Sequence, residues 1–410
     1  MIFRLSVRRR AVVIALAVFM LISMIELSMP GGAVAGPSEF AGMPVDPPPT
    51  LVVKSAIIAE ADTGQVLYQV NADERMAPAS ITKIMTILLA MERVEQGRVS
   101  LDDIVIVSRE ASLMGGSQVY LKEKEQVTVG DLLAATAIRS ANDASYALAE
   151  FIAGTADDFT RLMNKRAAEL GMTGTHFANP EGLDDPNHYT TARDILIMSR
   201  ELVRFPKVLE WTSTWIGKMR GGTYDLFNTN RLIKDYPGAD GLKTGHTDQA
   251  GYCLAGTATR NGIRLLSVVM GTAGDRERTQ ETIKLLDYGF RSFERVELVK
   301  EGAEVGTMKV PTAAIINVPV TASAPLAPIV PRGAGNQVSI ELKPSETPVK
   351  APIKAGERLG SVVAAGPNGE ELARADAIAA SDVRRANPLV RIYRAIVSFI
   401  SNLFAGGRGK

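Results

Sequence analysis

The sequence predicts an α+β protein: an antiparallel sheet with a helical block beside it, followed by a small all-β domain and a C-terminal amphipathic helix. Residues 51–293 have strand patterns near both ends and helical patterns between them, as expected when one sheet is built from distant segments. From about residue 296, short β-rich runs alternate with Pro and Gly turns, which indicates an all-β domain at 296–380. The last segment, 387–405, repeats apolar residues at helical spacing.

Residues 1–35 have the pattern of a secretory signal peptide. A basic start that includes Arg4 is followed by the apolar run 11–25 and by Ala33-Val34-Ala35, small residues at the usual cleavage spacing. An uncleaved membrane anchor is the alternative, although the run is short for a spanning helix. We therefore expect an exported protein, in the periplasm or on the outer face of the cytoplasmic membrane. The next segment, 36–50, is a Pro-rich linker that we expect to be flexible.

Turn and cap residues mark the ends of the elements within 51–293. The apolar runs 54–60 and 64–70 are joined by a turn at Asp62-Thr63-Gly64. Asn261-Gly262 is the favoured dipeptide for a hairpin turn, and it joins the apolar runs 250–259 and 263–271. Helical patterns occupy 81–97, 129–138 and 277–293.

The C-terminal helix is predicted to begin at Asn387-Pro388, an N-cap residue followed by a Pro at the first helical position. Its apolar residues share one face, Arg391 and Arg394 lie on the opposite face, and Arg384 and Arg385 precede it. The uncharged run after Arg394 is too short to span a bilayer. This pattern suits the interface of an anionic membrane, so we expect peripheral anchoring. The alternative is a terminal helix docked on its own protein.

Ser80 and Lys83 are the first pair of residues that indicate chemistry. Residues three apart on a helix are neighbours, so the Ser80 hydroxyl and the Lys83 amine can approach one another. The helix that follows is apolar on nearly every face and is therefore expected to be buried. Burial lowers the pKa of a Lys, and a neutral amine can take the proton of a neighbouring Ser and make it a nucleophile. The alternative is a Lys that extends from the helix end to solvent.

Two further fragments strengthen this interpretation. Ser140-Ala141-Asn142 lies between two helical patterns, and an extended backbone there would direct a hydroxyl and an amide into one site. Lys243-Thr244-Gly245 leads into the hairpin at Asn261-Gly262, which places it on or beside a sheet strand. An edge strand offers backbone groups to an extended peptide, while Lys243 adds positive charge and Gly245 permits close approach.

The composition excludes several other classes of function. Of the 410 residues 46% are hydrophobic and 22% are charged, with a formal net charge of +1, which gives no argument for a nucleic-acid partner. The His and Cys residues show no metal-ligand spacing, so we expect neither a metal nor another cofactor. His246 follows a candidate motif, whereas His176 and His188 are expected to shape a loop. Cys253 is the only cysteine, and its apolar surroundings predict a place in the core.

Together and in this order, Ser80-Ile81-Thr82-Lys83, Ser140-Ala141-Asn142 and Lys243-Thr244-Gly245 form the triple signature of serine enzymes that act on D-Ala-D-Ala peptides and β-lactams. The chain resembles the low-molecular-mass penicillin-binding proteins, specifically the serine-type D-alanyl-D-alanine carboxypeptidases. The resemblance runs from about Val53 to the C-terminal helix and includes APASITKIMT, SANDAS, HFANPEGLDDPNHYTTARD and DGLKTGHTDQAGYCL. It implies a penicillin-binding, serine β-lactamase-like catalytic domain, with a β-rich second domain and a membrane-bound tail.

The resemblance implies a role for four side chains of the first two motifs and for two backbone N–H groups. Ser80 would be the acylated nucleophile and Lys83 its general base. Ser140 would relay a proton towards the leaving amine, and Asn142 would hold the substrate amide. The backbone N–H groups of Ser80 and His246 would form the oxyanion hole.

The remaining residues would bind the substrate. Lys243 would keep the site electropositive, Thr244 would help bind the terminal carboxylate, and Gly245 would leave room for the peptide. Arg278 matches a family Arg thought to attract that carboxylate, although Arg276 is close enough to leave the assignment open.

The function implied by the resemblance is removal of the terminal D-Ala from peptidoglycan pentapeptides through a Ser80 acyl-enzyme, with β-lactams as covalent inhibitors. A class A-like β-lactamase is one alternative, because those enzymes use a Glu to activate the deacylating water. The nearest candidate, Glu181, lacks their usual sequence surroundings. A peptidoglycan endopeptidase and a non-enzymatic cell-wall scaffold or β-lactam sensor are the others.

Overall fold

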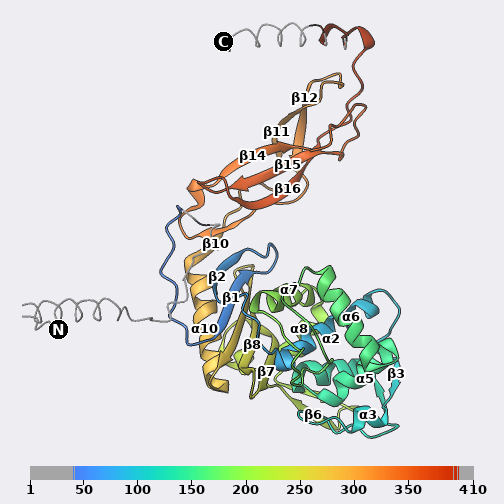
Figure 1. The fold of residues 1–410 in the computed structure, drawn as a ribbon. Coiled ribbons are helices and arrows are strands. Elements are labelled where there is room, and N and C mark those ends of the chain that lie inside the picture. Colours follow the sequence, from blue (N-terminus) through green and yellow to red (C-terminus); the bar gives the residue numbers. More distant parts are fainter. Residues whose placement is uncertain (1–39, 41, 391, 395, 397–410) are drawn as a thin grey trace, which may run out of the picture. The chain divides into compact units, whose positions relative to one another are not determined.

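The computed structural model of the chain describes Phe40 and residues 42–390, 392–394 and 396 (Figure 1). The predicted signal peptide, 1–35, and most of the predicted C-terminal helix, 387–405, lie outside the described residues. Residues 388–390, 392–394 and 396 are helical, which agrees with the predicted start of that helix.

The catalytic domain is built on a five-stranded antiparallel sheet with the strand order β2-β1-β9-β8-β7. Its strands are β1 (Ser55–Glu60), β2 (Val66–Val70), β7 (Ala239–Thr247), β8 (Gly251–Arg260) and β9 (Ile263–Thr272). Both ends of the domain meet in this sheet because β1 pairs with β9, with Ile57 opposite Val268. Strand β7 lies at one edge, so no other strand of the described residues pairs with its outer side.

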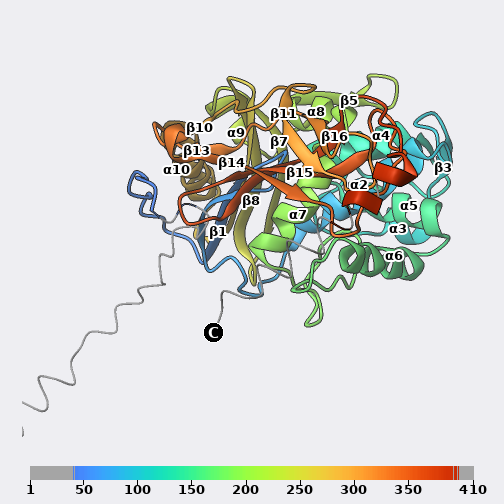
Figure 2. The ribbon, with the colours of Figure 1, turned by 90° about the horizontal axis from the view of Figure 1, so that it is seen from above.

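Both faces of the sheet are buried, because successive side chains of a strand point to opposite faces. In β1, Ile57 and Ala59 pack into the core on one face, and Ala56 and Ile58 pack into the core on the other. Helix α10 (Asp275–Ser292) covers the second face, and the helical block covers the first (Figures 1 and 2). The block contains η2 (Ala79–Thr82), α2 (Lys83–Glu95), α3 (Arg109–Ser112), α4 (Val129–Ala134), η3 (Ala135–Arg139), α5 (Asn142–Ala153), α6 (Ala156–Glu169), α7 (Ala192–Leu202) and α8 (Pro206–Ser213).

Shorter elements complete this domain. Two small antiparallel pairs are formed by β3 (Ile104–Ile106) with β4 (Gln126–Thr128) and by β5 (Ile216–Met219) with β6 (Tyr224–Phe227). Helix α9 (Leu232–Asp235) precedes β7, and its Leu232 is buried in the core on the α10 side.

The second domain is a five-stranded antiparallel sheet with the order β11-β12-β16-β15-β14. Its strands are β11 (Glu304–Lys309), β12 (Asn317–Ala322), β14 (Ser339–Pro344), β15 (Arg358–Ala365) and β16 (Glu371–Ala379). A separate pair, β10 (Phe293–Arg295) with β13 (Ile329–Pro331), and the short helix η4 (Gly335–Gln337) complete it. An α+β domain followed by an all-β domain was predicted, and the prediction is confirmed.

The Pro-rich lead contradicts one prediction. Flexibility was expected for 36–50, yet Phe40 and Met43 are buried in the core. The Phe40 ring lies 5.1 Å from the ring of Phe293, just after α10, and the Ser292 hydroxyl donates to Asp46 at 3.0 Å. The expectation is wrong for the described part of the lead because Phe40 and Met43 bury apolar surface in the core that includes Phe293, which outweighs the flexibility of an isolated Pro-rich segment.

Candidate active site

Ser80 and Lys83 lie on consecutive helical segments at the start of the helical block. Ser80 belongs to η2, and Lys83 is the first residue of α2. The Lys83 Nζ lies 2.9 Å from the Ser80 Oγ, to which it donates a hydrogen bond. Ser80 is half-buried, whereas Lys83 has no exposed surface. A substrate can therefore reach the Ser80 hydroxyl, while the Lys83 amine beside it stays shielded from water.

Lys83 is surrounded by neutral oxygen acceptors. Besides Ser80, its Nζ donates to the Asn142 Oδ1 at 2.7 Å and to the backbone carbonyl of Glu181 at 2.5 Å. Burial lowers the pKa of Lys83 to about 7, against the opposing influence of the negative charges of Glu181 and Asp143. A substantial fraction of the amine is thus neutral near pH 7, as a general base for Ser80 requires.

The backbone that carries Ser80 is held from two sides. Ala79 has a left-handed conformation with φ +48, which is strained for a residue with a side chain. Gly182 packs directly on it, because a Cβ atom at Gly182 would overlap the Ala79 carbonyl group. On the other side a Cβ atom at Gly245 of β7 would lie 3.0 Å from the Pro78 carbonyl oxygen. Only glycines permit these approaches.

The segment 178–183 links the helices that carry the site. The Pro180 carbonyl accepts hydrogen bonds from Thr86 of α2 at 2.6 Å and from Ser145 of α5 at 2.9 Å. The Glu181 carboxyl group is almost completely buried, and its Oε2 has no hydrogen-bond partner among the described residues. Burial raises the pKa of Glu181. The sequence suggests Glu181 only as a possible counterpart of a β-lactamase Glu, and no local pattern in it predicts the contact with Lys83.

Two of the histidines shape the neighbouring loop, as predicted. His176 Nδ1 lies 2.6 Å from the Asn187 carbonyl. The buried His188 has its Nε2 2.9 Å from the hydroxyl of Thr82, between Ser80 and Lys83 in the chain. Burial lowers the pKa of His188 to about 4, so the ring is neutral at pH 7. It therefore supports the turn that contains Thr82 without adding a charge to the site.

The Ser140-Ala141-Asn142 motif differs from its predicted geometry. Ser140 has a left-handed conformation with φ 64 at the end of η3, and Asn142 is the first residue of α5. The prediction of an extended backbone is therefore wrong at Ser140: only two residues, Ser140 and the extended Ala141, separate the two helices, and the left-handed Ser140 makes that reversal possible. The Asn142 side chain bridges Lys83 and the Gly115 carbonyl, to which it donates at 2.7 Å.

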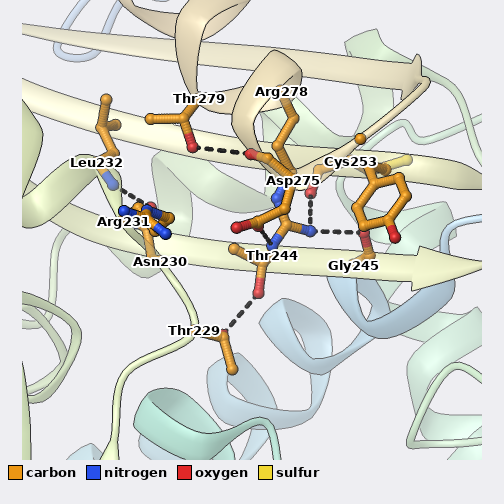
Figure 3. A network of polar contacts seen from close by, with 12 residues as sticks. Thr229, Asn230, Arg231, Leu232, Thr244, Gly245, Cys253, Asp275, Arg278 and Thr279 are labelled. Atoms are coloured by element: carbon orange, nitrogen blue, oxygen red, sulfur yellow. Dashed lines mark hydrogen bonds and ion pairs between the residues drawn. The ribbon is translucent and has the colours of Figure 1, made fainter.

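Lys243, Thr244 and Gly245 lie on the edge strand β7, as predicted. Lys243 is buried and its Nζ donates to the Thr244 carbonyl at 2.8 Å. Burial lowers the pKa of Lys243, and the positive charges of Lys83 and Arg278 lower it further. The Thr244 hydroxyl lies 2.7 Å from the hydroxyl of Thr229 (Figure 3), a residue that the sequence did not single out.

The structure distinguishes Arg278 from Arg276. The buried Arg278 extends from α10 to the sheet, where its Nη1 donates to the carbonyls of Gly245 at 3.1 Å and Cys253 at 3.4 Å, and it pairs with Asp275 (Figure 3). Arg276 is exposed. Of the two, Arg278 is thus the one that lies against the Lys-Thr-Gly strand. Cys253 itself is completely buried, as predicted.

His246 is exposed at the end of this strand, and its ring centroid lies 3.9 Å from that of Tyr252 on β8. The side chain therefore packs along the sheet edge. Taken together, the structure places Lys83 in direct contact with both Ser80 and Asn142, and it places β7 against η2. No cluster of His, Cys, Asp and Glu side chains that could hold a metal ion is found in the described part of the chain.

Comparisons with known proteins agree with this geometry. Residues 43–274 match the family model described as D-alanyl-D-alanine carboxypeptidase, and residues 293–385 match the model of the penicillin-binding protein 5 C-terminal domain. The D-alanyl-D-alanine carboxypeptidase DacF of Bacillus subtilis is 42% identical over 337 residues, which cover 81% of this chain and 86% of that protein.

Solved structures give the same result. Penicillin-binding protein 5 from Haemophilus influenzae is 33% identical with a TM-score of 0.74, and the match covers 83% of this chain and 99% of that one. Penicillin-binding protein D2 from Listeria monocytogenes, in its ampicillin-bound form, is 36% identical with a TM-score of 0.55, covering 60% of this chain and 100% of that one. From the family match over most of the catalytic domain and the long DacF alignment, we conclude that the chain belongs to the D-alanyl-D-alanine carboxypeptidase family.

Proposed function

We propose that this protein is a serine carboxypeptidase that removes the terminal D-Ala from peptidoglycan pentapeptides. The observation that carries the proposal is the hydrogen bond between the buried Lys83 amine and the accessible Ser80 hydroxyl. Membership of the family supplies the substrate class.

In the first half of the reaction, the neutral Lys83 amine takes the Ser80 proton while the Oγ attacks the carbonyl carbon of the penultimate D-Ala. The negative charge that develops on the carbonyl oxygen is stabilised by the backbone N–H groups of Ser80 and His246. The C–N bond then breaks, and D-Ala leaves after its amine receives a proton through Ser140. Water cleaves the acyl-enzyme in the second half and restores the Ser80 hydroxyl.

Three groups near the Lys-Thr-Gly strand are suited to the free carboxylate of the substrate. Lys243 and Arg278 are buried basic side chains, Lys243 makes no ion pair with a carboxylate among the described residues, and Thr244 supplies a hydroxyl. A peptide carboxylate would favour the charged form of Lys243, against the burial and the neighbouring positive charges that lower its pKa.

The β-lactamase alternative receives less support. A class A β-lactamase uses a Glu carboxylate to activate the deacylating water, whereas the contact between Lys83 and Glu181 is made by the Glu181 backbone carbonyl. We therefore expect β-lactams to form a long-lived adduct on Ser80.

Labelling with a fluorescent penicillin, followed by mass spectrometry of the labelled peptide, tests the site. We expect the adduct on Ser80 and no D-Ala release from a D-Ala-D-Ala peptide by Ser80→Ala. Lys83→Arg, whose side chain stays protonated, should retain the fold but lose acylation by a factor of about 10² or more. An adduct on another residue, or D-Ala release by Ser80→Ala, would overturn the proposal.

We also propose that the protein is exported by residues 1–35 and held at the membrane surface by its C-terminal helix. No helix among the described residues has the length and apolar character needed to cross a bilayer. The described start of the tail exposes apolar side chains, with Leu389 75% and Tyr393 68% exposed, as expected of a helix that lies in an interface. Deletion of 387–410 should release the protein from membranes; retention of the truncated protein would contradict the anchoring.

A further inference from the structure

We propose that the loop between β11 and β12, residues 310–316, is a second membrane-contacting element that inserts into an anionic lipid surface beside the C-terminal helix. The inference rests on the proposed anchoring, because it takes the bilayer as the surface that the tail binds. It adds a contact made by the all-β domain itself, which the amphipathic tail does not require.

The loop is apolar where a loop is usually polar. Its sequence, VPTAAII, contains no charged residue, although connections between strands are normally rich in polar turn residues. Ile315 is 60% exposed and Ile316 is 37% exposed. The only other large hydrophobic side chain with comparable exposure among residues 293–386 is Ile340, on a strand. Ile315 and Ile316 lie where the loop runs into β12, and neither belongs to the core cluster of the domain, so their exposed surface indicates a contact outside it.

The loop and the root of the tail form one unit. The Ala314 N–H donates to the Arg384 carbonyl at 2.8 Å, and the Ala386 N–H donates to the Thr312 carbonyl at 2.9 Å. The Arg394 guanidinium, which belongs to the tail helix, donates to the Ala313 carbonyl at 2.7 Å. These bonds join the loop to the chain just before the helix and to the polar face of the helix at Arg394, so the loop lies next to the helix that the bilayer would receive.

The charges around this unit have the sign that an anionic bilayer attracts. Arg384, Arg385 and Lys309 are exposed next to the loop. Neither the loop nor residues 383–396 contain an acidic residue. The preceding Asp382 has its carboxylate engaged by the Ala355 N–H at 2.8 Å. Apolar side chains surrounded by basic ones are the combination that stabilises binding to anionic lipid surfaces.

A second contact has a mechanical consequence. A helix joined to the domain by one short connection could pivot about it, so the domain would have no preferred orientation on the membrane. With the loop and the helix both inserted, the β domain would be held in one orientation and the catalytic domain would be presented in a limited range of directions.

The test uses the chain from residue 36 to 410 and vesicles of equal parts phosphatidylglycerol and phosphatidylcholine, in a sedimentation titration. The double variant Ile315→Ser/Ile316→Ser should bind roughly tenfold more weakly, because two partly exposed isoleucines lose their insertion; a tenfold change corresponds to about 1.4 kcal/mol. Ile340→Ser, also exposed and in the same domain, is the matched control and should bind as the unmodified chain does. An unchanged circular dichroism spectrum and thermal unfolding curve show that each variant, including its all-β domain, is folded.

A second measurement does not depend on weakened binding. Ile316→Trp should show a blue-shifted emission on vesicle addition and quenching by brominated lipids, relative to the parent chain with its tryptophans in the catalytic domain. Unchanged binding of the double serine variant, or an unshifted and unquenched signal from the introduced tryptophan in bound protein, would refute the loop contact. If deletion of 387–410 releases the protein while the double serine variant binds normally, anchoring by the C-terminal helix is supported and the loop contact is refuted.

Discussion

Gly245→Ala tests whether the close approach of β7 to η2 sets the geometry of the reaction. A Cβ atom at Gly245 would lie 3.0 Å from the Pro78 carbonyl oxygen and 3.1 Å from both the backbone nitrogen and the Cγ1 of Ile81. These separations are shorter than ordinary van der Waals contacts, and two of the three atoms belong to the backbone. The strand and the turn that carries Ser80 must therefore move apart by a few tenths of an ångström.

The expected loss of rate follows from the two proposed oxyanion donors, which lie on either side of the contact between β7 and η2. The proposed oxyanion donors are the N–H groups of Ser80, beyond Pro78, and of His246, next to Gly245. Loss of one such donor costs about 10²–10³ in rate, and a misplacement of about 1 Å costs about 10². A displacement of a few tenths of an ångström should thus lower the acylation rate constant and kcat/KM by roughly tenfold.

Gly256→Ala is the matched control, because it overfills the same sheet on its other face. There a Cβ atom would lie 2.9 Å from side-chain atoms of Leu232 and of Thr282, on the α10 side. Overpacking of this kind costs about 1–3 kcal/mol of stability, which lowers Tm by about 2–4 °C per kcal/mol, and the acylation rate at 25 °C should not change. The two variants are compared by stopped-flow acylation with a fluorescent penicillin and by thermal unfolding. Acylation of Gly245→Ala at the unmodified rate, or an equal rate loss in both variants, would refute the reasoning.

Three further predictions concern charge. Glu181→Gln removes a negative charge that raises the pKa of Lys83, so the acid limb of the acylation pH profile should move to lower pH; an unchanged or raised midpoint would contradict the coupling. Arg278→Lys loses the paired contacts to the sheet and should reduce kcat/KM for D-Ala release by about tenfold, whereas Arg276→Lys should stay within about twofold; equal effects would remove the distinction. The pKa of His188 is lowered from 6.5 to about 4, so the unfolded chain binds the extra proton first, and stability falls as pH drops from about 6.5 towards 4. The free energy of unfolding that is lost in this way reaches about 3 kcal/mol. The Tm of His188→Gln should therefore depend less steeply on pH in this range.

The elements that could be predicted from the sequence have local signals. The hairpin of β8 and β9 turns at Asn261 and Gly262, both with positive φ, which is the conformation that this dipeptide favours. The SxxK pair could be predicted for a similar reason, since residues three apart in one turn meet whatever surrounds them. The β7 assignment also followed from its position just before that hairpin.

The features that could not be predicted depend on segments far apart in the chain. The contact of Lys83 with the Glu181 carbonyl joins residues that are 98 positions apart, and no pattern around either of them encodes it. The left-handed Ser140 follows from two helices that must turn sharply to pack together, although a serine in isolation avoids that conformation. Phe40 is a further example. A Pro-rich segment is expected to be exposed to solvent, and nothing within the segment itself predicts that its one aromatic residue packs against Phe293.

The position of the nucleophile is the result of these long-range contacts more than of its own helix. Ala79 is strained, and a strained conformation persists only where the surroundings determine it. Gly182, in the segment 178–183, packs against the carbonyl oxygen of Ala79. Gly245, on β7, packs against the neighbouring carbonyl of Pro78. The same two segments also touch the base and the proposed oxyanion site, through the Glu181 carbonyl and the His246 backbone. One rearrangement of either segment would therefore shift the nucleophile and its partners together, so substitutions at these glycines should act on rate before they act on substrate affinity.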